Sequence, residues 1–178
     1  MRHDDFLDAF RRLGQRLTEP ARLVLAGGSA MILLGYTDRD TGDGDAIDAS
    51  PKLSQIRRYI EDVAEDIGVA PNWLNDAVRA HRDVLPADFH ERLTPVGTFG
   101  QLTVECLGRR DLILMKLAAG RPRDLDDIQA LQPTPDEIVW VEGQLDRLSR
   151  VAPHRALRIQ LYLEQGSTRE IDGNAEDE

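Results

Sequence analysis

The chain has 178 residues, a net charge of −10 and a single cysteine. Its length suffices for one domain, or for one domain with a small helical appendage. The acidic balance argues against a protein that binds nucleic acid through bulk positive charge, so any RNA contact must be local. Because no long apolar segment or signal-like N-terminus is visible, we expect a soluble cytoplasmic protein without membrane contact.

The first 35 residues predict a helix, a strand and a second helix. Apolar residues at helical spacing predict an amphipathic helix that Pro20 ends. Residues 23–26 are an apolar run of strand type that breaks at Gly27 and Gly28, and residues 29–34 then predict a short buried helix. Such a turn offers free backbone N–H groups to a phosphate. The alternative is an ordinary tight turn.

Two aspartates, Asp43 and Asp45, precede a short half-apolar run and predict the start of a second strand. Residues two apart in a strand point to the same face. Two neighbouring carboxylates repel each other unless a cation binds between them, and oxygen ligands of this kind suit Mg²⁺ completed by substrate phosphates. The alternative is a solvated acidic turn, which Asp48 would extend.

The middle of the chain predicts a helix and a β-hairpin. Ser50 as N-cap, Pro51 in the first turn and apolar residues spaced by three and four predict a helix up to Gly68. Residues 70–90 predict a short helix near Trp73, whose side chain we expect in the core, followed by a loop. The hairpin covers residues 93–96 and 102–107.

Glu105 is the one acidic residue in an otherwise apolar predicted strand, where burial without a partner costs free energy. A metal ion would remove that cost, so Glu105 is a candidate third carboxylate ligand. The alternative is an edge-strand glutamate that faces water. The neighbouring Cys106 predicts a buried, inert thiol.

Lys116 interrupts an apolar helical stretch at 112–119, where a lysine can also reach the surface by extending its side chain along the helix. Thr134 and Pro135 predict the start of a helix from 136 to about 151, and a last helix covers about 153–164. Residues 166–178 are acidic, and we expect them to be disordered.

Several of these motifs together resemble a known superfamily. The G-G-S turn at 27–29 and the R-x-T-x-D-x-D motif at 39–45 resemble nucleotidyltransferases of the DNA polymerase β type. Residues 116–128 resemble the K-L-x-A-x-R-x-R-D-x-x-D-I region of AbiEii-like toxins, small bacterial members found in toxin–antitoxin and abortive-infection loci. The resemblance covers about residues 23–131 and includes Trp73-Leu74-Asn75 and the strand at 102–107.

The resemblance implies an α/β (α+β) nucleotidyltransferase fold: a small mixed sheet flanked by helices over residues 1–131, with a C-terminal helical part at 132–165. It implies that Asp43 and Asp45, with Glu105, bind Mg²⁺ or Mn²⁺. Asp124 would contact the lysine, the metal or the acceptor. The nucleotide contacts that it implies are Gly27, Gly28, Ser29, Arg39, Thr41 and Lys116.

The activity implied by the resemblance is transfer of NMP from an NTP to an acceptor. For a growth-inhibiting toxin the acceptor would be a tRNA 3′ end, with a local basic patch at Arg109, Arg110, Arg121 and Arg123. One alternative is an antitoxin that adds AMP to a partner toxin protein. Another is a catalytically degenerate binding module, because Gly42 and Gly44 weaken the strand that carries the aspartates.

Overall fold

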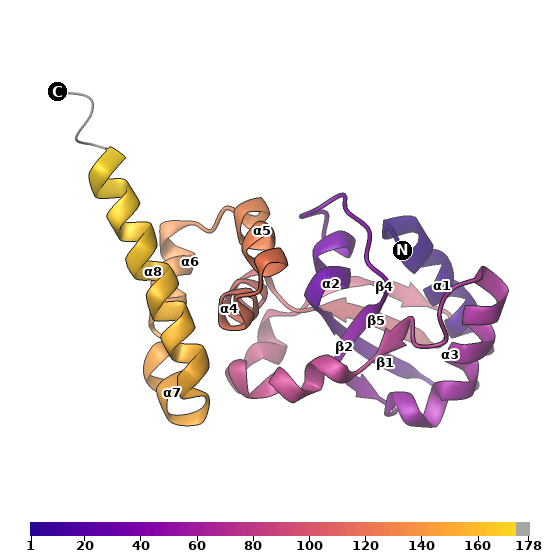
Figure 1. Cartoon of the computed structure of the whole chain (residues 1–178). Helices are drawn as coiled ribbons and strands as arrows, with labels where there is room; N and C mark the ends of the chain where they lie inside the picture. The colour runs from indigo at the N-terminus through magenta and orange to yellow at the C-terminus, as the bar shows by residue number, and fades with distance from the viewer. Residues whose placement is uncertain (174–178) are drawn as a thin grey trace. The chain divides into compact units, whose positions relative to one another are not determined.

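The computed structural model describes residues 1–173 and divides the chain into two compact units (Figure 1). Unit 1 consists of Met1–Arg82 and Ala87–Leu112. Unit 2 consists of Asp83–Pro86 and the residues from Ile113 onward. The division falls inside helix α4 (Arg109–Ala119), whereas the sequence predicted a boundary at residue 131.

Unit 1 is built on a five-stranded mixed sheet in the order β3-β2-β1-β5-β4. Strand β1 pairs with β2 in antiparallel and with β5 in parallel orientation, and β3 is parallel to β2 while β4 is antiparallel to β5. The predicted α/β fold with a small mixed sheet is therefore confirmed. The strands are β1 (Ala21–Ala26), β2 (Gly44–Ser50), β3 (Leu74–Asn75), β4 (Thr94–Phe99) and β5 (Leu102–Cys106).

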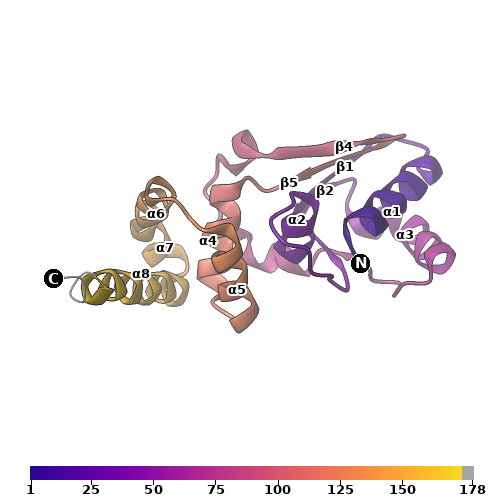
Figure 2. The same ribbon diagram turned by 90° about the horizontal axis from the view of Figure 1, so that it is seen from above.

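Three helices accompany this sheet on one side (Figure 2). They are α1 (His3–Arg16), α2 (Gly27–Leu33) and α3 (Leu53–Ile67). Helix α1 approaches the hairpin closely at Gly14, where an added Cβ would lie 1.6 Å from the Phe99 carbonyl oxygen. The apolar stripe predicted for α1 is buried in the core, at Phe6, Phe10 and Leu13.

The register of the sheet divides its side chains between two faces. Leu102, Val104 and Cys106 are buried on the face that α1 covers, since Leu102 lies against Gly14 of that helix. The other face of the sheet carries Glu105 and Asp45. Glu105 is paired with Val24 across neighbouring strands, and Asp45 is paired with Ala26. A β-bulge in β2 pairs Asp48 with Val24, so the Asp48 side chain lies on the same face. One face of the sheet is therefore apolar and the other bears carboxylates.

Two local predictions between residues 50 and 90 were wrong. Ser50 ends strand β2 instead of capping a helix, and α3 begins at Leu53 after Lys52. Trp73 opens no helix: it is followed by the short strand β3 and by the 3₁₀ helices η1 (Ala77–Val84) and η2 (Phe89–Arg92). The expected burial of Trp73 is confirmed, and its indole N–H donates to the Ile60 carbonyl at 3.0 Å.

Unit 2 is helical. Thr134 accepts a hydrogen bond from the backbone N–H of Glu137 at 3.3 Å and starts α6 as predicted, but Gly143 and Gln144 separate α6 from α7 where one continuous helix was expected. Helix α8 continues beyond Glu164, through the first part of the segment predicted to be disordered, and residues 174–178 lie outside the described residues. The helices that complete unit 2 are α5 (Pro122–Leu131), α6 (Pro135–Glu142), α7 (Leu145–Val151) and α8 (Pro153–Gly173).

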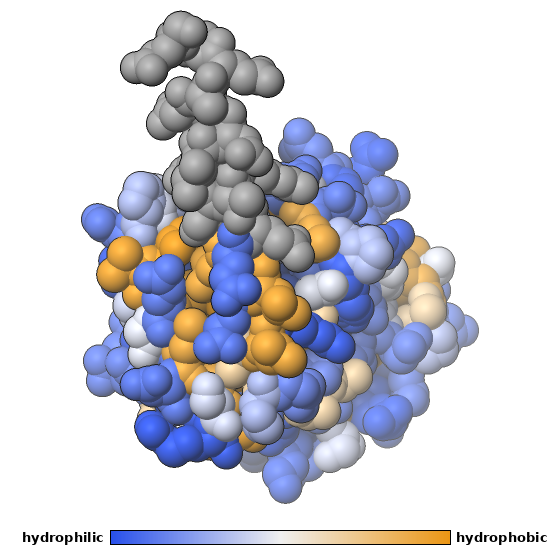
Figure 3. Space-filling view, turned by 60° about the vertical axis from the view of Figure 1, so that its left-hand side comes forward, coloured by the Kyte–Doolittle hydropathy of each residue, from blue (hydrophilic) through white to orange (hydrophobic). Residues whose placement is uncertain are grey.

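The surface of unit 2 carries exposed apolar side chains, and Figure 3 shows apolar side chains gathered in the view that brings α8 forward. None of the helices in the described part of the chain combines the length and the apolar composition that crossing a bilayer requires. The large apolar side chains exposed in unit 2 are Leu125, Val139, Val151, Leu157 and Leu161.

Candidate active site

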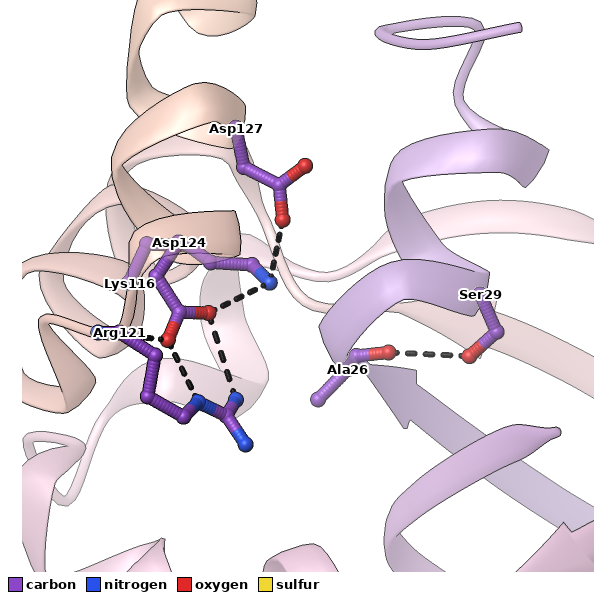
Figure 4. Close-up of polar contacts among 6 residues, drawn as sticks. All are labelled: Ala26, Ser29, Lys116, Arg121, Asp124 and Asp127. Atoms are coloured by element: carbon purple, nitrogen blue, oxygen red, sulfur yellow. Dashed lines mark hydrogen bonds and ion pairs between the residues drawn. The ribbon is translucent and has the colours of Figure 1, made fainter. Parts of the chain in front are cut away.

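Ser29 connects the end of β1 to the beginning of β2. Its side chain is fully buried, and its hydroxyl donates to the Ala26 carbonyl at 3.0 Å (Figure 4). The same oxygen accepts the backbone N–H of Asp45 at 3.2 Å. Because both hydrogen bonds lie within the protein, the Ser29 hydroxyl fixes the position of Asp45 in this structure. The phosphate contact that the resemblance implied for Ser29 stays a prediction.

Gly27 makes room for the carboxylate of Asp45. Its φ of 63° lies in the left-handed region, which glycine adopts without a steric penalty. A Cβ at this position would lie 2.4 Å from Asp45 Oδ2, closer than any real contact. The backbone conformation therefore favours glycine here, and the missing side chain leaves room for the half-buried carboxylate of Asp45.

Gly28 lies beside the arginine and the threonine of the R-x-T-x-D-x-D motif. A Cβ on Gly28 would lie 3.5 Å from a terminal guanidinium nitrogen of Arg39 and 3.5 Å from the Thr41 hydroxyl oxygen. The structure therefore brings Gly28, Arg39 and Thr41 together within unit 1, although eleven residues and more separate them in sequence. A guanidinium and a hydroxyl beside an open glycine backbone form a group of donors that suits a phosphate.

Asp43 and Asp45 are placed differently from each other. Strand β2 begins at Gly44, so Asp43 lies immediately before the strand while Asp45 lies within it. The Asp43 Oδ2 atom accepts a hydrogen bond from the side-chain amide of Asn75 at 3.0 Å. Both aspartates are half-buried.

Gly44, which separates the two aspartates, is explained by packing. It is buried, and an added Cβ would lie 3.3 Å from the Phe6 ring and 3.4 Å from Leu74 Cδ1. Its N–H donates to the Trp73 carbonyl at 2.5 Å. The glycine therefore lets β2 pack closely against α1 and β3, and these neighbours hold the strand that carries Asp45 in place.

Glu105 forms an ion pair with Arg22 of the neighbouring strand. The Nε–Oε2 distance is 2.6 Å, and the glutamate side chain is 22% exposed. Among the side chains that the structure describes, no three His, Cys, Asp or Glu residues converge closely enough to hold a metal ion. The structure thus brings Asp43 and Asp45 to one end of β2 and gives Glu105 a cationic partner of its own.

Cys106, the next residue of β5, is fully buried. Burial raises the pKa of its thiol to about 12. The expected inert thiol is therefore present in the structure.

Lys116 is buried between two aspartates within unit 2 (Figure 4). Its Nζ lies 3.0 Å from Asp124 Oδ1 and 2.6 Å from Asp127 Oδ2. Lys116 is 6% exposed and the two aspartates are 1% and 2% exposed, so the lysine does not extend to solvent. The three side chains form a charged cluster between α4 and α5, which we call the Lys116 cluster.

Asp124 also receives hydrogen bonds from Arg121 at the start of α5. The guanidinium Nε of Arg121 donates to Asp124 Oδ2 at 2.7 Å, and the backbone N–H of Arg121 donates to the same atom at 3.2 Å. Burial raises the pKa of Asp124, but the hydrogen bond from Arg121 and the charge of Lys116 outweigh it, so the net pKa is lowered. Asp124 is therefore ionised at neutral pH.

The predicted basic patch consists of residues that already have partners or that lie in different units. Arg109 lies over the Tyr36 ring at 5.4 Å within unit 1, and Arg121 pairs with Asp124 within unit 2. Arg110 belongs to unit 1 and Arg123 to unit 2, and both are exposed.

Three residues with direct contacts to predicted site residues were not predicted. Asn75 contacts Asp43, Asp127 contacts Lys116, and Arg22 contacts Glu105. Asp127 is the second aspartate of the R-D-x-x-D motif, so its spacing of three from Asp124 on a helix could have indicated it. Asn75 belongs to the Trp73-Leu74-Asn75 segment of the resemblance, but nothing in that segment indicated a contact with Asp43.

A mixed sheet whose G-G-S turn lies against an R-x-T-x-D-x-D segment is consistent with a nucleotidyltransferase fold. The chain belongs to the family described as "Nucleotidyltransferase of unknown function (DUF6036)", whose family model matches residues 5–139. No curated protein and no solved structure matches the chain.

Proposed function

We propose that unit 1 binds an NTP together with Mg²⁺ or Mn²⁺ and transfers its NMP to an acceptor hydroxyl. The observation that carries this proposal is the construction around Asp45. Its backbone is held by Ser29, and its carboxylate lies where Gly27 has no side chain. A solvated acidic turn would need neither the hydrogen bond to Ser29 nor the space at Gly27. Together these two features fix the carboxylate of Asp45 beside the turn that joins β1 to α2.

The residues at the start of β2 fit a hard divalent cation. Asp43 and Asp45 supply half-buried carboxylate oxygens, and Mg²⁺ in phosphoryl-transfer sites uses one or two carboxylates together with substrate phosphates and water. A two-carboxylate site is consistent with Glu105 being paired with Arg22. When bound, such a cation supplies charge stabilisation at the phosphates and orientation of the reacting groups.

The remaining motif residues bind and orient the nucleotide in this proposal. Arg39 and Thr41, which lie beside Gly28, donate to the phosphates. The acceptor oxygen forms a bond to the α-phosphorus while the bond from that phosphorus to the bridging oxygen breaks, and pyrophosphate leaves. Positioning and charge stabilisation provide most of the rate acceleration in such transfers.

The acceptor and the biological role rest on the resemblance to AbiEii-like toxins. It favours a tRNA 3′ end as the acceptor and a role in a toxin–antitoxin or phage-defence system. The same resemblance assigns a contact with Lys116 to Asp124, and the 3.0 Å ion pair between the two side chains supports this assignment.

The proposal is tested by transfer of label from each of the four [α-³²P]NTPs, with total tRNA and with total protein as acceptors. We expect divalent-dependent labelling that Asp43→Asn and Asp45→Asn abolish. Asp48→Asn is the matched control, because Asp48 lies on the same face of β2 but is 3.5 Å from both Arg82 and His90. Labelled RNA supports the toxin role, and labelled protein supports the antitoxin alternative. Full transfer by Asp45→Asn would overturn the proposed site.

A further inference from the structure

We infer that Asn75 is a positioning residue that orients the carboxylate of Asp43 for the cation. This inference rests on the proposed function, because it concerns how one of the two proposed cation ligands is held. Asp43 lies just before β2 begins, so the sheet does not fix it as it fixes Asp45. Some other group must hold its side chain if the two carboxylates are to act together.

The hydrogen bonds of Asn75 define the orientation of its amide. Its side-chain oxygen accepts the backbone N–H of Ala77 at 3.0 Å, and its side-chain nitrogen donates to Asp43 Oδ2 at 3.0 Å. A flipped amide would direct its N–H₂ group at the Ala77 N–H and its oxygen at the Asp43 carboxylate, and both contacts would be repulsive. The amide therefore has one orientation, in which it donates to Asp43.

The backbone of Asn75 is itself fixed from two sides. Strand β3 pairs with β2 in the register Gly44 to Leu74 and Asp45 to Asn75. Trp73, two residues earlier, is anchored in the core and accepts the N–H of Gly44. Asn75 thus holds Asp43 from a neighbouring strand, at the same end of β2 where Ser29 holds Asp45.

The hydrogen bond from Asn75 suits a cation ligand because it orients the Asp43 carboxylate without neutralising its charge. An amide N–H binds one carboxylate oxygen and carries no net charge, so the charge of Asp43 remains available. Oδ1 of Asp43 is then left for the cation. An arginine or lysine in this place would compete with the cation, as Arg22 does at Glu105.

The experiment follows the melting temperature of the full chain during a titration with MnCl₂, with and without a non-hydrolysable NTP. Asn75→Ser keeps an acceptor that can reach the Ala77 N–H, but it is too short to reach Asp43. Asn72→Ser is the control, since Asn72 is an exposed asparagine three residues earlier. We expect Asn75→Ser to need about tenfold more Mn²⁺ for half of the thermal shift, which corresponds to losing a hydrogen bond to a charged group. Asn72→Ser should behave as wild type.

Combination with Asp43→Asn separates positioning from a merely structural role. If Asn75 acts through Asp43, Asn75→Ser adds no further loss of Mn²⁺ affinity to Asp43→Asn. An unchanged Mn²⁺ midpoint in Asn75→Ser, or full additivity with Asp43→Asn, would overturn the inference while the proposed function stands. Absence of any Mn²⁺ shift in wild type, together with unchanged NTP transfer by Asp43→Asn, would overturn both.

Discussion

Replacing Lys116 by methionine is expected to destabilise the protein strongly. Methionine conserves most of the side-chain volume, so packing on the apolar side of α4 changes little. It removes the charge that lies 3.0 Å from Asp124 and 2.6 Å from Asp127, and both aspartates stay buried. Removing one partner of a buried ion pair costs about 3–5 kcal/mol, because the remaining charges lose their compensation.

The loss is measurable as a melting temperature. For a chain of this size about 1 kcal/mol corresponds to 2–4 °C, so Lys116→Met should melt roughly 6–20 °C below wild type at pH 7. Adding Asp127→Asn to Lys116→Met should recover part of the loss, because one uncompensated carboxylate is then removed. A melting temperature of Lys116→Met equal to that of wild type would refute the proposed energetic role of the Lys116 cluster.

The difference in stability between wild type and Lys116→Met should depend on pH, and its direction follows from the pKa of Asp124. The pKa of Asp124 is lowered in the folded state, so its ionised form contributes stability above the unfolded pKa of about 3.9. That contribution is lost as the pH falls through the folded pKa. Lys116→Met raises the pKa of Asp124, and therefore the stabilities of the two proteins should differ most at neutral pH and converge only as the pH falls below the lowered folded pKa of Asp124.

The other predictions concern the turn at Gly27 and the buried thiol. Gly27→Ala should abolish Mn²⁺ binding, because its Cβ displaces Asp45, whereas Gly35→Ala should cost only about 1–2 kcal/mol of backbone strain in urea unfolding. Equal Mn²⁺ affinity in the two variants would contradict the close approach. Cys106, whose thiol pKa is about 12 through burial, should not react with a thiol reagent at pH 8 until the protein is unfolded. Rapid labelling of the native protein would contradict its burial.

The sequence predicted the fold well where a strong periodic or motif signal was present. The apolar stripe of α1 and the strand that breaks at Gly27 were both recognisable from residue spacing alone. The hairpin was recognisable from its two apolar runs. Strand β3 was not recognisable from the sequence, because it contains only Leu74 and Asn75. Its position is fixed by pairing with β2, and local sequence does not indicate such a long-range contact.

The candidate site was only partly predictable, for a related reason. The motif spacing indicated Asp43 and Asp45, but Asn75, which donates to Asp43, lies 32 residues later in the chain. Glu105 was a candidate ligand because a carboxylate in an apolar strand needs a partner. The sequence could not show that Arg22, one strand away, is that partner. Likewise the sequence indicated Lys116 as a charged residue in an apolar helix. Only the packing of α5 against α4 shows that Asp124 and Asp127 are its ion-pair partners.

The most direct test of the proposed site is calorimetric binding of a non-hydrolysable NTP in the presence of Mn²⁺, since binding requires no knowledge of the acceptor. Wild type and the control Asp48→Asn should bind nucleotide only when the cation is present. Asp43→Asn and Asp45→Asn should each weaken cation-dependent binding by tenfold or more, by about 1.5–3 kcal/mol for a lost charge-assisted contact. Cation-independent binding, or binding of equal strength by all four proteins, would contradict a catalytic metal–nucleotide site at Asp43 and Asp45.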